Sequence, residues 1–93
     1  MKFLAVCGFG VGSSMVLKLS IEKACKDRNI GCEVENTDLS SAKGANVDAV
    51  FTSHELAEEL ENSMKCPVFP IKRYMDKEEV GQSLDQLLEN RGN

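Results

Sequence analysis

The 93-residue chain is long enough for one domain with a single hydrophobic core, and we expect residues 1–93 to form that domain. Its formal net charge of −4 argues against a nucleic-acid partner, and its 42% of hydrophobic residues is too high for a disordered chain. No apolar run approaches the ~20 residues that span a membrane, and there is no signal peptide, so we expect a cytoplasmic protein without direct membrane insertion.

The chain has four cysteines and one histidine. Thiols stay reduced in the cytoplasm, so we expect no disulfide framework. No C-x-x-C pair is present, and one histidine is a poor supply of further ligands, so we expect no metal site. Nothing in the sequence calls for an organic cofactor. We expect Cys25, Cys32 and Cys66 to pack as small apolar side chains, which leaves Cys7 for chemistry.

The first third of the chain has the pattern of a strand, a glycine-rich turn, a helix and a second strand. The apolar run Phe3–Val6 is typical of a strand that is buried on both faces. Apolar residues then recur every fourth position and predict a helix over about residues 14–28, with Gly31 at its C-cap. The alternating segment Cys32–Glu35 predicts a strand at an edge of the sheet.

The middle of the chain predicts a turn, a third strand and a short helix. Residues 38–44 are typical of a turn or a single helical turn, and Val47–Phe51 has the composition of a strand. Thr52 is followed three residues later by Glu55, which is the spacing of a capping box. We therefore expect a short helix that is capped at Thr52 and ends near Asn62.

The last third of the chain predicts a fourth strand and a final helix. Pro67–Ile71 gives a short, peripheral strand, because its two prolines remove donors from the hydrogen-bond ladder. Asp76 is followed three residues later by Glu79, so Asp76 is the expected cap of the last helix. The apolar stripe of this helix contains Val80, Leu84, Leu87 and Leu88.

Alternation of strands and helices predicts an α/β fold in three αβα layers, with a four-stranded parallel sheet. The order fits a doubly wound fold of flavodoxin-like or Rossmann-like type, similar to the low-molecular-weight phosphatase fold. Ligands of such sheets bind at the carboxyl ends of the strands, near the switch in strand order. Residues 7–14, 52–55 and 73–76 are expected at that edge.

Cys7 follows a buried strand and precedes the start of a helix, where free N–H groups and the helix dipole favour the thiolate. Gly8, Gly10 and Gly12 allow backbone N–H groups to converge on one point, as in an anion cradle. Ser13 and Ser14 add hydroxyl donors, and Ser13 is also a candidate N-cap. The predicted phosphate-binding residues are Gly8, Phe9, Gly10, Val11, Gly12, Ser13 and Ser14, with Cys7 as the nucleophile.

Thiol phosphatases have an arginine six residues after the cysteine, and this chain has Ser13 there. Without a guanidinium, a hydrolytic transition state is less well stabilised, so a phosphocysteine persists until an acceptor arrives. The loop therefore favours carrying a phosphoryl group over hydrolysing it.

The segment Cys7-Gly-Phe-Gly-Val-Gly-Ser-Ser-Met15, after a strand near the chain start, resembles the IIB components of the bacterial phosphotransferase sugar-uptake system. The likeness is to the ascorbate-type proteins of the ascorbate/galactitol group, and it extends to chain length and element order. It implies a phosphotransferase whose Cys7 takes a phosphoryl group from a histidine of a IIA protein. It also implies transfer to a sugar bound in the membrane component IIC, through which the protein associates peripherally with the membrane.

Two other functions are compatible with the same cysteine. One is a hydrolase related to low-molecular-weight phosphatases or arsenate reductases, and the other is a non-enzymatic regulatory or redox-sensing thiol domain. His54 is an auxiliary candidate that donates to a phosphate, although a first-turn surface position also accounts for it. Asp76 as a general acid is weighed against helix capping, and the pair Lys72 and Arg73 against solvated surface charge. Phe9 and Val11 are candidates for a docking rim.

Overall fold

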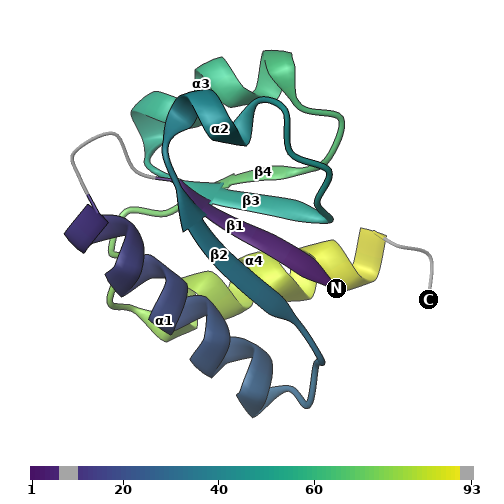
Figure 1. The fold of residues 1–93 in the computed structure, drawn as a ribbon. Helices are drawn as coiled ribbons and strands as arrows, with labels where there is room; N and C mark the ends of the chain where they lie inside the picture. Colours follow the sequence, from purple (N-terminus) through teal and green to yellow (C-terminus); the bar gives the residue numbers. More distant parts are fainter. Residues whose placement is uncertain (7–10, 91–93) are drawn as a thin grey trace.

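The computed structural model describes residues 1–6 and 11–90, and it describes the side chains of residues 1–6 and 15–89. The described residues form one four-stranded parallel sheet in the order β2-β1-β3-β4 (Figure 1). The strands are β1 (Lys2–Val6), β2 (Glu33–Thr37), β3 (Ala49–Thr52) and β4 (Val68–Pro70). The helices are α1 (Val11–Asp27), α2 (Leu39–Ala42), α3 (His54–Ser63) and α4 (Lys77–Asn90). The predicted fold class is confirmed.

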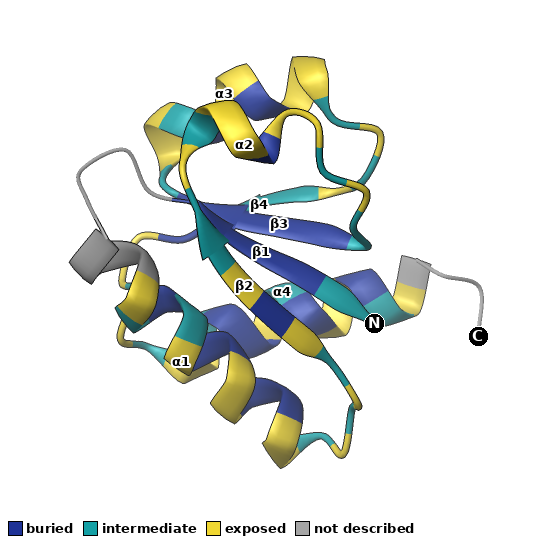
Figure 2. Ribbon diagram, viewed as in Figure 1, coloured by how far each residue is buried: buried dark blue, intermediate teal, exposed yellow. Residues whose placement is uncertain are grey.

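Helices cover both faces of the sheet, with α1 and α4 on one side and α2 and α3 on the other (Figure 1). Strand β1 packs against both layers of helices, because its successive side chains point to opposite faces of the sheet. Phe3 and Ala5 belong to the core under α1 and α4, whereas Leu4 and Val6 belong to the core under α2 and α3. The continuous apolar run at the start of the chain is therefore that of a strand buried on both faces, as Figure 2 shows.

The predicted helix stripes lie in the core. Leu17, Ile21 and Cys25 of α1 are fully buried and pack with Val80 and Leu84 of α4. At the end of α1 the Arg28 guanidinium forms an ion pair with Asp85, at 2.8 Å from Nε to Oδ1, and this pair ties α1 to α4. The short strands β2 and β4 lie at the edges of the sheet, as the alternating pattern and the two prolines predict.

Both ends of α1 differ from the prediction. The helix begins at Val11, three residues before Ser14, so Ser13 lies inside the first turn and is not the N-cap. At the other end, Asn29 rather than Gly31 adopts the left-handed conformation, with φ of 55°. The Ile30 N–H donates to the Cys25 carbonyl at 2.9 Å, and the Asn29 N–H donates to the Lys26 carbonyl at 3.1 Å. This is a Schellman closure, and asparagine tolerates the left-handed position that it needs.

The expected helix cap at Thr52 is wrong by one residue. Thr52 is the last residue of β3, pairs with Val6 of β1, and is fully buried. Ser53 caps α3 instead, because its hydroxyl accepts from the Leu56 N–H at 3.3 Å. Parallel pairing with β1 extends the strand through Thr52 and moves the cap to the next hydroxyl in the chain.

The cap at Asp76 is confirmed, whereas the second half of its capping box is not formed. Asp76 Oδ1 accepts from the backbone N–H groups of Glu78 and Glu79, at 2.9 and 3.3 Å. The Glu79 carboxylate turns away from the cap and accepts from the backbone N–H groups of Lys72 and Arg73, at 2.8 and 3.0 Å. Glu79 thereby holds the loop that leaves β4.

Candidate functional site

The switch in strand order lies between β1 and β3. These central strands are neighbours, yet β1 is followed by α1 on one face of the sheet and β3 is followed by α3 on the opposite face (Figure 1). In an open parallel sheet the chains diverge at such a point and leave a crevice at the carboxyl ends of the strands. The carboxyl end of β1 at Val6 lies at this edge, and Cys7 is the next residue in the sequence.

Thr52 fixes the end of β1. Its Oγ1 donates to the Val6 carbonyl at 2.8 Å in a buried position, in addition to the pairing of the two residues in the sheet. The Val6 carbonyl belongs to the peptide bond that leads into Cys7. The capping-box spacing predicted Thr52 as a helix cap, so this function was missed. The signal that could have found it is a hydroxyl residue at the end of a strand next to the cysteine-bearing strand.

The start of α1 favours an anion on three grounds. The first N–H groups of a helix have no partner within the helix, and the helix dipole places partial positive charge there. The first turn of α1 has no acidic residue. Residues 8–12 are Gly, Phe, Gly, Val and Gly, none of which carries a side-chain oxygen that could cap the helix.

The other three helices begin differently. Asp38 Oδ1 accepts from the Ser41 N–H at 2.8 Å at the start of α2, Ser53 caps α3, and Asp76 caps α4. The hydrogen bonds from Ser41 hold the pKa of Asp38 below its ordinary value. Asp76 is engaged in capping, which is the role that the sequence favoured over a general acid.

The predicted site residues divide into three groups. Cys7, Gly8, Phe9 and Gly10 lie outside the described residues, so their roles stay predictions. The backbone of residues 11–14 forms the first turn of α1, and the side chains of Ser13 and Ser14 are outside the description. His54 is the exposed first residue of α3, and the parallel pairing of β1 with β3 brings the start of α3 to the same sheet edge.

Lys72 and Arg73 are exposed, and their backbone N–H groups donate to the Glu79 carboxylate. The contacts of the described residues give their side chains no role in binding a partner. Within residues 1–6 and 11–90 no group of three or more histidine, cysteine or acidic side chains is arranged to hold a metal ion. In the same residues no helix combines the length and apolar character needed to cross a bilayer.

Comparison with known proteins gives a consistent result. The family model described as "PTS system, Lactose/Cellobiose specific IIB subunit" matches residues 2–86. The chain is 30% identical over 87 residues to the ascorbate-specific PTS system EIIB component of Mycoplasma pneumoniae, covering 91% of this chain and 92% of that protein. The fold is similar to the lactose-specific IIB component domain of the Streptococcus pneumoniae phosphotransferase system. That match has a TM-score of 0.59 at 16% identity and covers 96% and 95% of the two chains.

The family match defines a phosphotransferase of the IIB class, whose members carry a phosphoryl group on a cysteine. The chain belongs to the lactose/cellobiose-specific IIB family of the sugar phosphotransferase system. It is therefore a phosphoryl carrier of sugar uptake, and its family works between a IIA and a IIC component. The predicted family and its activity are confirmed.

Proposed function

We propose that Cys7 is the phosphoryl carrier and that residues 8–14 form its phosphate cradle. The observation that supports this most is the start of α1, because the first N–H groups of a helix have no partner within the helix and the sequence between Cys7 and α1 has no side-chain oxygen to cap them. Thr52 adds support, since its hydroxyl holds the carbonyl that precedes Cys7.

Two in-line displacements make up the proposed reaction. The Cys7 thiolate attacks the phosphorus of the IIA phosphohistidine, the S–P bond forms, and the P–N bond breaks with its electron pair returning to the imidazole. A sugar hydroxyl then attacks the same phosphorus, gives its proton to solvent, and displaces the Cys7 thiolate as the S–P bond breaks. The backbone N–H groups of residues 8–14 and the hydroxyls of Ser13 and Ser14 hold the equatorial oxygens in both steps.

Phosphoryl transfer is favoured over hydrolysis because the two groups that would assist hydrolysis are not available. Ser13 occupies the position of the phosphatase arginine, which removes the bidentate contact to the transition state. Asp76, the candidate general acid, accepts two backbone N–H groups as the cap of α4. A water molecule attacking the phosphocysteine would lack both forms of assistance.

The substrate proposal follows the relative from Mycoplasma pneumoniae, which is named ascorbate-specific. We assign this chain to a system that transports ascorbate or a related sugar, with a IIA protein as donor and IIC holding the sugar. The protein then works at the cytoplasmic face of the membrane and is held there through IIC. His54 is an auxiliary donor to the phosphoryl group, positioned by the start of α3.

The test is intact mass after incubation with phosphoenolpyruvate, the general phosphotransferase proteins and a IIA protein of ascorbate type. We expect one phosphoryl group on the natural chain and on the control Cys66→Ser, and none on Cys7→Ser, because an unactivated hydroxyl is a poor nucleophile. Equal phosphorylation of Cys7→Ser would overturn the assignment. Steady turnover of an aryl phosphate would favour the hydrolase, and a Cys7 that reacts with oxidants but never accepts phosphate would favour the redox domain.

A further inference from the structure

A second thiol site lies at the opposite end of α1. Cys25 is in the last turns of α1, and the Schellman closure folds the chain back so that Cys32, just before β2, lies beside it. Cys32 packs against the core cluster that contains Cys25. Both residues line one surface depression, together with Glu22, Lys26, Asn29, Ile30 and Gly31.

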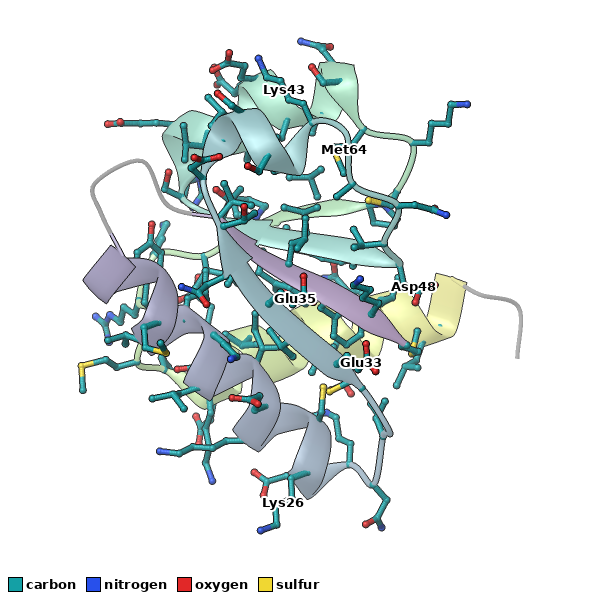
Figure 3. All side chains as sticks on the ribbon, in the orientation of Figure 1. Lys26, Glu33, Glu35, Lys43, Asp48 and Met64 are labelled. Atoms are coloured by element: carbon teal, nitrogen blue, oxygen red, sulfur yellow. The ribbon has the colours of Figure 1, made fainter. Side chains whose placement is uncertain are left out.

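This pair is remote from the proposed phosphoryl site. Figure 3 labels Lys26, the neighbour of Cys25 in the chain, and Glu33, the neighbour of Cys32. Both lie toward the amino ends of the strands, whereas the start of α1 lies toward the carboxyl ends. The inference therefore stands independently of the proposed role of Cys7.

The two thiols have unequal access to solvent. Cys25 is 1% exposed and belongs to the hydrophobic core, whereas Cys32 is half-buried and lines a second depression with Met1, Lys2 and Asp48. Burial, with a smaller contribution from the neighbouring Cys32, raises the pKa of Cys25 to about 12. A solute oxidant therefore reaches Cys32 first, and Cys25 stays a protonated thiol in the core beside it.

We propose that Cys25 and Cys32 are an oxidation site that forms an intramolecular disulfide when the protein meets hydrogen peroxide. In the first step Cys32 Sγ, as thiolate, attacks one peroxide oxygen, the O–O bond breaks, and the hydroxide that leaves takes up the proton that Cys32 lost. Cys32 is then a sulfenic acid. In the second step Cys25 Sγ attacks Cys32 Sγ, the S–O bond breaks, and the departing hydroxide takes up the proton of Cys25. Two thiols have lost two electrons and two protons, and the peroxide has become two waters.

Proximity of the two thiols favours the second step over its alternatives. Cys25 is poorly ionised, yet it lines the same depression as Cys32 and belongs to the core against which Cys32 packs, so the attack is intramolecular. The sulfurs must approach to about 2 Å, and rotation of the half-buried Cys32 side chain supplies that movement. Further oxidation of Cys32 to the sulfinic acid is thereby outcompeted.

The experiment treats the full chain with peroxide, unfolds it in an alkylating reagent, and maps the tryptic peptides. Trypsin separates residues 24–26, which contain Cys25, from residues 29–43, which contain Cys32, and it leaves Cys7 in residues 3–18. We expect the first two peptides to be linked, with loss of two alkylatable thiols, and dithiothreitol to restore both. Oxidation of Cys7 is read separately on its own peptide.

Variants make the result specific. Cys32→Ser and Cys25→Ala should abolish the link, and the alanine keeps a small apolar side chain in the core. Cys66→Ser removes another half-buried thiol beside a strand and should leave the link unchanged. The proposal is overturned if Cys25 and Cys32 are both still alkylated at a peroxide dose that fully oxidises Cys7. It is also overturned if Cys32 accumulates as sulfinic acid, or links to Cys66 or to a second chain.

Discussion

Replacement of Thr52 by valine tests whether a buried hydroxyl positions the peptide that leads into Cys7. Valine has nearly the same shape, so the change removes one hydrogen bond, from Thr52 Oγ1 to the Val6 carbonyl at 2.8 Å, in a fully buried position. A hydrogen bond of this kind contributes about 1 kcal/mol to stability. For a domain of this size that corresponds to a fall in melting temperature of roughly 4–8 °C.

The functional effect should exceed the effect on stability. Loss of the tether frees the Val6 carbonyl, and a displacement below 1 Å in a nucleophile is enough for a loss of about tenfold in the rate of phosphoryl acceptance. The matched control is Thr52→Ser, which keeps the hydroxyl and removes one buried methyl group at a similar cost of about 1 kcal/mol. The assay is the initial rate of phosphorylation by IIA, measured beside thermal unfolding. If both variants are phosphorylated at the same rate, the hydroxyl does not position the site.

Two further predictions concern stability. Leu84→Ala opens a cavity in the fully buried layer between α4 and α1, and we expect a loss of about 3 kcal/mol in denaturant unfolding, with a smaller loss for the half-buried Leu88→Ala. The depressed pKa of Asp38 means that its carboxylate stabilises the fold above the ordinary value of 3.8 and that this contribution is lost as pH falls through the lower folded-state value. Asp38→Asn keeps a capping oxygen but does not titrate, so the free energy of unfolding of this variant should depend less on pH between about 5 and 2. If denaturant unfolding shows the same pH dependence for the variant and the natural chain, Asp38 does not contribute in this way.

The core was predictable because it depends on periodicity alone. A continuous apolar run is typical of a strand that is buried on both faces in the middle of a parallel sheet, and β1 occupies that place. The stripe of Leu17, Ile21 and Cys25 has the helical repeat, and all three residues are buried. The edge position of β4 followed in the same way from its prolines.

The ends of helices and strands were harder to predict, because tertiary contacts decide which of two neighbouring residues ends a strand and which caps a helix. Both Thr52 and Ser53 have a hydroxyl that can cap a helix. Because Thr52 pairs with Val6, it becomes the last residue of β3, and Ser53 caps α3. Glu79 had the spacing of a capping box, but the backbone of the loop after β4 offers it two N–H donors. The sequence contains no local signal for that contact. The proximity of Cys25 and Cys32 was missed for a related reason, since it depends on the closure at Asn29 and not on a cysteine motif.

The contrast among helix starts leads to a last prediction. Three helices have a side-chain oxygen of their own chain at their first turn, whereas residues 7–10, which precede α1 in the sequence, carry no side-chain oxygen. Under the proposed function a phosphoryl group takes that place. Gly10→Asp would supply an internal carboxylate next to Val11, the first residue of α1. Because glycine is itself an acceptable N-cap, the gain in stability should be only a few tenths of a kcal/mol.

The effect on phosphoryl acceptance should be much larger. The carboxylate would occupy the N–H groups and repel the incoming phosphoryl oxygens, so we expect the rate to fall at least about tenfold, equivalent to ~1.4 kcal/mol. The control Gly10→Asn has nearly the same size and capping oxygen without the charge, and it should lose less. Raising the salt concentration should narrow the difference between the two variants, because the repulsion is electrostatic. Phosphorylation of Gly10→Asp at the natural rate would mean that the first turn of α1 does not hold the phosphoryl group.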